Sequence, residues 1–127
     1  MRVLVDGMNV IGSRADGWWR DRRGAMRSLA SALERYAEAT GEEVTLVLDG
    51  RPFDLGRLER VNAVFAPGPG PNAADRVIER LVSEDEDPSA ITVVTSDAAL
   101  AAAVRAAGAR VKGAGGFRRR LDELTVS

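Results

Sequence analysis

The feature that most constrains the fold of this chain is a set of short apolar runs that alternate with helical patterns. Continuous apolar runs rich in β-branched residues are typical of strands that are buried on both faces of a sheet. Such runs lie at residues 3–5, 44–48 and 91–95, with weaker ones at 61–66 and 109–111. Helical spacing of apolar residues occupies about 21–39, 73–83, 97–107 and 117–124. The alternation predicts an α/β fold with a parallel central sheet of about five strands, helices on both faces and right-handed crossovers.

Turn signals bound these elements. The Asp-Gly pairs at Asp6 and Asp49 each stop an apolar run, and we expect a turn at both places. Segment 67–72 is rich in Gly and Pro, so it can hold neither a strand ladder nor a helix. We expect it to be a loop that supplies Asn72 as the N-cap of the next helix, and the acidic segment 84–88 to be a solvated connection. We find no internal repeat, and a chain of 127 residues predicts one domain spanning 1–127.

Two residue types are absent, and their absence excludes several chemistries. Without Cys there can be no disulfide, thiol nucleophile or cysteine-bound zinc. Without His there is no imidazole base, no Ser-His-Asp triad and no nitrogen ligand of the commonest kind. A metal ion must then be held by oxygen, which favours Mg²⁺, Mn²⁺ or Ca²⁺. The first residues contain no signal-peptide core and no run approaches a membrane span, so we expect a cytoplasmic protein without a membrane partner.

Aspartates follow three of the predicted strands. They are Asp6, Asp49 and Asp97, and Asp75 lies in the first turn of a helix whose start should face the same edge of the sheet. Ligands of open α/β sheets bind at this edge. Taken singly, each aspartate is also explained by a turn, an N-cap or a first helical turn. Together, four converging carboxylates repel one another unless a cation or protons compensate, so we predict that all four bind one or two Mg²⁺ or Mn²⁺ ions that serve phosphodiester hydrolysis.

Polar residues beside these aspartates are assigned supporting roles. The amide of Asn9 could position a water molecule or a phosphate, or it could cap its own turn. Thr95 and Ser96 could orient the aspartate that follows them. Glu79, one turn along the 73–83 helix, is better explained by a surface ion pair with a neighbouring arginine than by a further metal ligand.

A segment rich in Trp and Arg follows the first strand. It runs from Trp18 to Arg27, and its candidate substrate-binding residues are Trp18, Arg20, Arg22, Arg23 and Arg27. Rings that stack on bases and cations that meet phosphates are what a single-stranded nucleic acid requires. An equally supported interpretation has one Trp packed into the core and the arginines on a solvated face. We expect a solvated face for Arg118-Arg119-Arg120, and the sequence pI of about 5.5 indicates local and transient contact with nucleic acid.

Four segments in order resemble the NYN domain, a relative of PIN-domain nucleases, and more narrowly its YacP-like branch. They are residues 5–13 (VDGMNVIGS), 44–50 (VTLVLDG), 73–82 (AADRVIERLV) and 91–97 (ITVVTSD). The resemblance implies a Rossmannoid, PIN-like three-layer sandwich and a metal-dependent endoribonuclease that hydrolyses single-stranded RNA, with ribosome-associated mRNA among its partners. It also implies an acidic cluster of Asp6, Asp49, Asp75 and Asp97 with Asn9 beside it. The sequence departs from the family at 68–74, where Gly-Pro-Gly-Pro-Asn-Ala-Ala replaces a polar stretch that often carries Thr.

Two alternatives belong to other classes. A phosphoryl-accepting receiver domain would use Asp49, Thr95 and Lys112, but such domains carry paired acidic residues at the end of the first strand, where this chain has Asp6 alone. That interpretation also leaves two aspartates without a role. The other alternative is an RNA-binding or ribosome-associated module that has lost its chemistry, against which the intact set of four aspartates argues.

Overall fold

Five parallel strands form the centre of the molecule. The computed structural model describes residues 2–68 and 72–126. The strands are β1 (Arg2–Asp6), β2 (Glu43–Asp49), β3 (Val61–Ala66), β4 (Ile91–Val94) and β5 (Arg110–Lys112), and their order in the sheet is β3-β2-β1-β4-β5. All four pairings are parallel. The strand order reverses between β1 and β4, and the carboxyl ends of these two strands therefore border the position where such sheets bind ligands.

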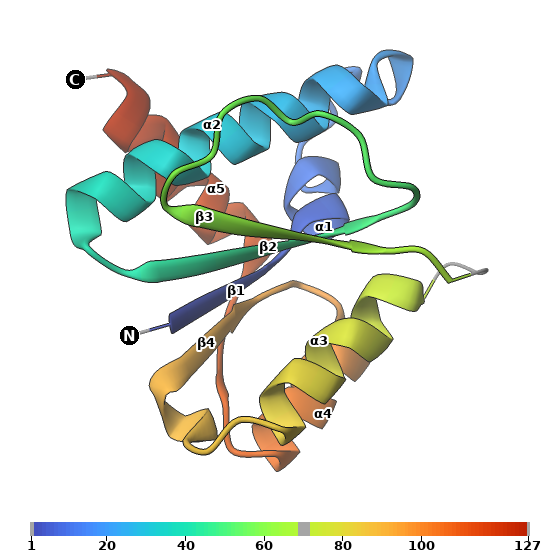
Figure 1. The fold of residues 1–127 in the computed structure, drawn as a ribbon, viewed down its shortest axis with the longest axis vertical. Coiled ribbons are helices and arrows are strands. Elements are labelled where there is room, and N and C mark those ends of the chain that lie inside the picture. The colour runs from blue at the N-terminus through green and yellow to red at the C-terminus, as the bar shows by residue number, and fades with distance from the viewer. Residues whose placement is uncertain (1, 69–71, 127) are drawn as a thin grey trace.

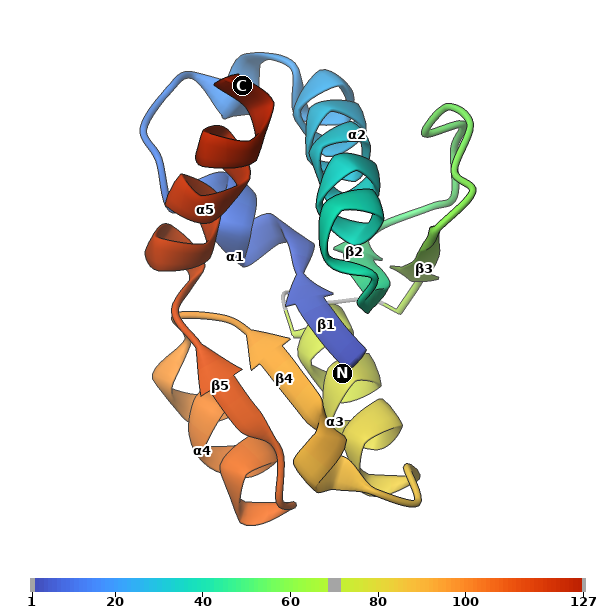
Figure 2. The same cartoon turned by 90° about the vertical axis from the view of Figure 1, so that its left-hand side faces the viewer.

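Helices cover both faces of this sheet, as the sequence predicts. The helices α1 (Gly7–Gly12), α2 (Arg22–Thr40) and α5 (Ala114–Val126) lie on one face, and α3 (Ala73–Ser83) and α4 (Ala98–Ala106) lie on the other (Figures 1 and 2). The α/β sandwich with a parallel sheet is thus confirmed. None of the helices within the described residues is long and apolar enough to cross a membrane.

Alternation along the strands divides the buried side chains into two cores. Val3 and Val5 of β1 belong to the first core, which α1, α2 and α5 cover, whereas Leu4 belongs to the second core, which α3 and α4 cover. The same alternation holds in β2, where Leu46 and Leu48 join the first core and Val47 joins the second. A strand-end residue therefore faces the side set by the residue two positions before it.

The start of α1 corrects the turn expected after Asp6. The chain passes from β1 directly into a helix at Gly7, because the absence of a side chain there lets the helix lie against β2. A Cβ atom at Gly7 would stand 2.5 Å from Leu48 Cδ2 and 2.9 Å from the carbonyl oxygen of Val47. An apolar run stopped by Asp-Gly precedes both turns and helices that pack closely against a neighbouring strand. The sequence pattern alone therefore does not distinguish the two structures.

Other boundaries differ less. The last helix begins at Ala114 instead of about 117, and it includes two glycines that helical propensity disfavours. Short 3₁₀ turns at Trp18–Arg20 and Pro88–Ala90 have no periodic signal in the sequence. Asn72 occupies the N-cap position of α3 as predicted, but its side chain makes no capping hydrogen bond. Residues 69–71 of the expected loop lie outside the described residues.

Candidate active site

Asp6 is the buried centre of the carboxyl edge. It ends β1 two positions after Leu4, so its side chain faces the second core and α3, and only 5% of it is exposed. Its neighbours in the sheet are the ends of β2 and β4. A carboxylate in such a place needs hydrogen-bond donors or a cation to remain charged.

Thr95 supplies the first of these donors. Its hydroxyl group donates to Asp6 Oδ2 over 2.9 Å and accepts from the backbone N–H of Asp97 over 3.1 Å. Thr95 is 1% exposed, and its own backbone N–H donates to the carbonyl oxygen of Lys112 over 3.0 Å. The hydroxyl therefore links the end of β1 to the start of α4. The predicted contact with the following aspartate exists, but it is made to that residue's backbone.

Asn9 joins α1 to the loop after β4. Its Oδ1 atom accepts a hydrogen bond from the backbone N–H of Ser96 over 2.7 Å. Ser96 Oγ in turn accepts from the backbone N–H of Ala114, over 2.8 Å, at the start of α5. The sequence left two roles open for Asn9, which were to position a water molecule or a phosphate and to cap its own turn. The hydrogen bond with Ser96 corresponds to neither role. It fixes the loop that carries Thr95 and leaves the Nδ2 group as the donor end of the amide.

Asp49 brings the start of α3 to the same edge. It ends β2 two positions after Val47, so its side chain also faces the second core. Asp49 Oδ1 accepts a hydrogen bond from the backbone N–H of Ala74 over 3.2 Å. Asp49 thereby caps the first turn of α3, which the side chain of the N-cap residue Asn72 does not do. Asp75 is the residue after Ala74 and lies in the first turn of α3. At the start of α4, Asp97 is the N-cap and accepts from the backbone N–H of Leu100 over 2.9 Å.

The charges of these aspartates act on one another. The pKa of Asp6 is raised to about 6: burial raises it most, the charges of Asp75 and Asp49 raise it as well, and the Thr95 hydroxyl and the Asn9 backbone N–H oppose the rise. The pKa of Asp75 is raised by burial and by the charges of Asp97, Asp49 and Glu79. The structure thus brings all four predicted aspartates within electrostatic reach at one edge of the sheet. Glu79 is exposed, and its charge adds to that field.

The donor set fits a hard cation. Among residues 2–68 and 72–126, no three acidic side chains already stand in the arrangement of a metal site. Mg²⁺ keeps several water molecules and needs only one or two protein carboxylates together with substrate phosphates. A buried carboxylate whose pKa is raised by neighbouring negative charge is stabilised by such an ion. Binding of a cation by Asp6, Asp49, Asp75 and Asp97 stays a prediction.

The Trp- and Arg-rich segment combines the two interpretations that its sequence allows. Trp18 packs against the first core, whereas Trp19 is 54% exposed. The guanidinium group of Arg22 lies 5.7 Å from the centre of the Trp18 ring. Arg20 and Arg22 are exposed at this end of α2. One Trp is thus a packing residue, and the exposed residues around it remain available to a ligand.

Phe53 is a residue that the sequence reasoning missed. The guanidinium carbons of Arg23 and Arg27 lie 4.9 Å and 5.3 Å from the centre of its ring, and Arg27 Nε donates to the carbonyl oxygen of Asp54 over 3.0 Å. The loop after β2 is therefore held against α2 by two stacked arginines. A single aromatic residue in a loop gave no periodic signal, and only its position beside Arg51 and Pro52 could have drawn attention to it.

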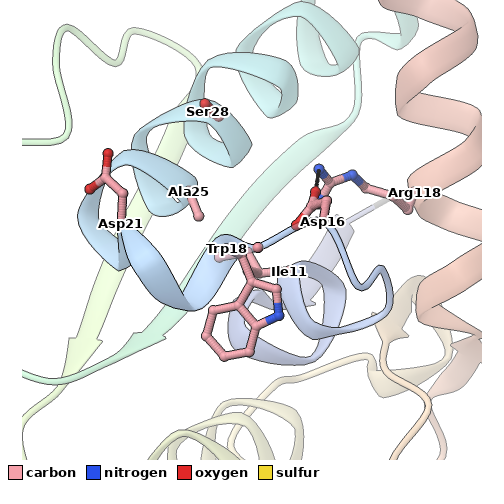
Figure 3. A pocket seen from close by; sticks show the side chains of 8 residues that line it. Ile11, Asp16, Trp18, Asp21, Ala25, Ser28 and Arg118 are labelled. Atoms are coloured by element: carbon pink, nitrogen blue, oxygen red, sulfur yellow. Dashed lines mark ion pairs between the residues drawn. The ribbon is translucent and has the colours of Figure 1, made fainter.

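A pocket lies between α1, α2 and α5, apart from Asp6, Asp49, Asp75 and Asp97 (Figure 3). Its volume is about 240 Å³, and its lining residues are Ile11, Asp16, Gly17, Trp18, Asp21, Ala25, Ser28 and Arg118. Arg118 Nη2 stands 3.8 Å from Asp16 Oδ2, and the Arg118 side chain is only 21% exposed. The solvated face expected for Arg118 is therefore wrong, because α5 turns this side chain inward, whereas Arg119 and Arg120 are exposed.

The receiver alternative is contradicted by the side that Lys112 faces. Lys112 pairs with Val94, whose side chain belongs to the first core, and it lines a cavity with Tyr36 of α2 on that side. Asp49 and Thr95 face the second core. A phosphoryl group at Asp49 could not be met by a lysine on the opposite face of the sheet, so the three residues do not form one site.

Comparisons with known proteins bear on the family and the fold of this chain. The YacP-like NYN domain matches residues 3–127. A crystal structure of Rae1 (YacP) from Bacillus subtilis, in a singly substituted form, is 27% identical with a TM-score of 0.81, and the match covers 98% of this chain and 77% of that one. Another structure of Rae1 (YacP) from Bacillus subtilis is 26% identical with a TM-score of 0.78, covering 98% and 75%. The comparison with curated proteins gave no match. The chain therefore belongs to the YacP-like NYN domain family, whose function is nuclease-like and related to RNA.

Proposed function

We propose that this protein is a metal-dependent endoribonuclease that hydrolyses phosphodiester bonds of single-stranded RNA, with ribosome-associated mRNA among its substrates. The observation that supports this most is the buried carboxylate of Asp6, surrounded by the charges of other aspartates at the edge where the strand order reverses. No imidazole or thiol is available for another hydrolytic mechanism. Membership in a nuclease-like family agrees with this assignment.

In this proposal Asp6 holds Mg²⁺ or Mn²⁺, with Asp49, Asp75 and Asp97 contributing directly or through water. The ion supplies Lewis acidity toward a phosphoryl oxygen and lowers the pKa of a water molecule. Thr95 keeps the Asp6 carboxylate charged and fixed in one orientation. The Nδ2 group of Asn9 is a donor suited to a phosphate oxygen. Exposed arginines at the start of α2 hold the phosphates on either side of the bond that is cleaved.

Cleavage of single-stranded RNA in Mn²⁺ and in EDTA tests this function. We expect cleavage with Mn²⁺ and none with EDTA, and Asp6→Asn should lower the rate at least a hundredfold. Because water is the nucleophile rather than the ribose 2′-hydroxyl group, the products should carry a 5′-phosphate and a 3′-hydroxyl group. Products that end in a 2′,3′-cyclic phosphate would contradict the mechanism. RNA binding without cleavage at any metal concentration would favour the inactive RNA-binding module.

A further inference from the structure

The pocket in Figure 3 has the lining of a binding site for a flat, polar ring. Its apolar surface comes from Ile11, Ala25 and the indole of Trp18. Its polar groups stand around that surface: Asp16 and Arg118 are paired on one side and Asp21 lies on the other, as Figure 3 shows. A volume of about 240 Å³ accommodates a ring system of one or two fused rings. Apolar walls with a few polar groups set around them are typical of small-ligand sites.

The charges around this pocket disfavour a phosphate as its occupant. Two carboxylates, Asp16 and Asp21, line the pocket together with one guanidinium group, that of Arg118, so an anion would meet net negative charge. A neutral ring that both donates and accepts hydrogen bonds satisfies both kinds of group. The 3.8 Å separation of Arg118 Nη2 from Asp16 Oδ2 exceeds hydrogen-bond length, so this pair of atoms is held by charge alone and both keep hydrogen-bonding capacity for a ligand.

We propose that this pocket binds a guanine base of the RNA, an inference that rests on the proposed function. Guanine presents O6 and N7 as acceptors on one edge, which match the donors of Arg118. It presents N1–H and the N2 amino group as donors on another edge, which match the carboxylate of Asp16, since the carboxylate of Asp21 caps α2 by accepting from the Gly24 N–H. Adenine has neither the O6 acceptor nor the N1–H donor. Stacking of unpaired bases on aromatic side chains, with hydrogen bonds to base edges, is how single-stranded RNA is read.

The pocket and the Asp6 carboxyl group lie on different sides of the sheet, because Asp6 faces the second core whereas the pocket is lined from α1, α2 and α5. Ile11 lines it from α1, the helix that begins directly after Asp6. The guanidinium group of Arg22 lies 5.7 Å from the centre of the Trp18 ring, which lines the pocket, and is the cation that we assign to the phosphate of a bound nucleotide. The pocket then acts as a specificity site and takes no part in the chemistry.

Fluorescence titration with mononucleotides tests the proposal without any cleavage. The chain has two Trp, and Trp19→Phe leaves Trp18 as the only indole. In this background, in EDTA, we expect GMP to change the emission of Trp18 and to bind at least about tenfold more tightly than AMP, CMP or UMP, which carry the same phosphate. Equal binding of the four nucleotides, or no binding of GMP at millimolar concentration, would overturn the assignment.

Two variants and one control locate the binding. Arg118→Gln should weaken GMP binding about tenfold or more, and Ala25→Leu should block the pocket with a residue that favours the helix. Arg119→Gln, an exposed arginine one position along α5, should leave GMP binding unchanged. Thermal melting identifies any variant that fails to fold, and Ala25→Leu then gives an answer independent of the Arg118–Asp16 ion pair. Unaltered GMP binding in a folded Ala25→Leu protein would show that the base binds elsewhere.

The inference and the proposed function fail in different ways. RNA cleavage in Mn²⁺ without GMP binding in EDTA would leave the nuclease intact and remove the guanine pocket. GMP binding without cleavage would keep the pocket and remove the nuclease. If both hold, cleavage of RNAs that differ by a single G-to-A change should fall about tenfold or more for the A-containing RNA, and Arg118→Gln should abolish this difference.

Discussion

The hydroxyl group of Thr95 donates a hydrogen bond to the Asp6 carboxylate over 2.9 Å, joining the ends of two neighbouring strands inside the protein. This bond favours the charged form of Asp6, whereas burial and nearby aspartates favour the protonated form. The state of Asp6 at neutral pH is therefore a balance between two hydrogen bonds, from the Thr95 hydroxyl and the Asn9 backbone N–H, and an unfavourable environment.

We expect Thr95→Val to shift that balance. The variant keeps the shape of the side chain but removes the donor, so the pKa of Asp6 should rise above about 6. Since a protonated carboxyl cannot bind a cation well, the pH at which metal-dependent cleavage reaches half its maximum should move upward. A pH-rate profile of kcat/KM at fixed Mn²⁺ measures it.

Thr95→Ser is the matched control because it keeps the hydroxyl group. Its pH-rate profile should lie near that of the wild type, while Thr95→Val should also lose about 1–3 kcal/mol of stability at neutral pH from the buried acceptor. Identical profiles for the Val and Ser variants would mean that the hydrogen bond does not control Asp6.

Asp6 should make the metal-free protein less stable as the pH rises. Its folded pKa of about 6 lies above the value of an unfolded aspartate, so between about pH 4 and 6 the folded state keeps a proton that the unfolded state has lost. Stability contributed by protonated Asp6 is complete below pH 4 and is lost as the pH rises to about 6, a change of up to roughly 3 kcal/mol.

Urea unfolding in EDTA from pH 4 to 7 measures this loss. Other carboxyl groups titrate in both proteins, so the informative quantity is the difference in unfolding free energy between the wild type and Asp6→Asn. Asparagine has no proton to lose at this position. The variant should become more stable relative to the wild type as the pH rises. A constant difference across the range would show that Asp6 titrates normally in the folded protein.

The order of the elements could be predicted from the sequence because buried parallel strands have a simple signature. The predicted start and end of β3 and α3 agree with the structure, and the other strands differ by one or two residues. Asp6, Asp49 and Asp97 could be placed at one edge because each follows a strand. What the sequence could not show was the face of the sheet: Lys112 and Thr95 both lie near strand ends but on opposite sides.

Contacts between distant loops were also beyond the sequence. Asn9 bonds to Ser96, and Phe53 receives two arginines of α2, yet neither contact has a periodic or local signal. The inward turn of Arg118 depends on where α5 begins, which its two glycines concealed. The roles of the four aspartates in metal binding remain predictions.

Gly7→Ala should disturb the site without touching a polar group. The new Cβ would approach the Val47 carbonyl oxygen to 2.9 Å, and a backbone atom cannot rotate away. We expect a loss of about 1–3 kcal/mol and, because α1 must move, a displaced Asn9 and slower cleavage.

Gly12→Ala is the control for this effect, since nothing lies within 4 Å of its added Cβ at the end of the same helix. It should leave cleavage unchanged and stability equal or higher by up to about 1 kcal/mol. Chemical denaturation and initial rates of both variants test the pair. Equal stability of the two would show that α1 does not need a glycine against β2.

Asp75→Asn and Asp97→Asn separate a shared cation site from independent structural roles. The pKa of Asp75 is raised by its surroundings, so removing its charge should leave the metal-free protein as stable or more stable. Asn also serves as an N-cap, so Asp97→Asn should keep the hydrogen bond from the Leu100 N–H. Both variants should lose most of the rise in Tm that Mn²⁺ gives the wild type.

Thermal melting in EDTA and in Mn²⁺ decides the question, with Glu38→Gln as the control. Glu38 is an exposed acidic residue of α2, and its loss should leave the full metal response. At a metal concentration a hundredfold above Kd, binding stabilises the folded state by about 2.7 kcal/mol, which gives a shift of several degrees. The same shift in all four proteins would mean that the aspartates share no cation.

The arginines at the start of α2 should act on RNA binding and not on chemistry. Arg22 and Arg23 are exposed and stack on aromatic rings that hold them at this end of the helix. Contacts made equally with substrate and transition state change KM alone, so replacing both by Ala should raise KM about tenfold with kcat near the wild-type value. Each lost phosphate contact should also reduce the slope of log KM against log salt by about 0.7.

The control removes two exposed arginines elsewhere, Arg35 and Arg110, and should change neither KM nor its salt dependence. Since both double variants lose the same charge, an equal rise in KM would indicate a general electrostatic effect, whereas a rise confined to Arg22 and Arg23 places the RNA backbone along this end of α2.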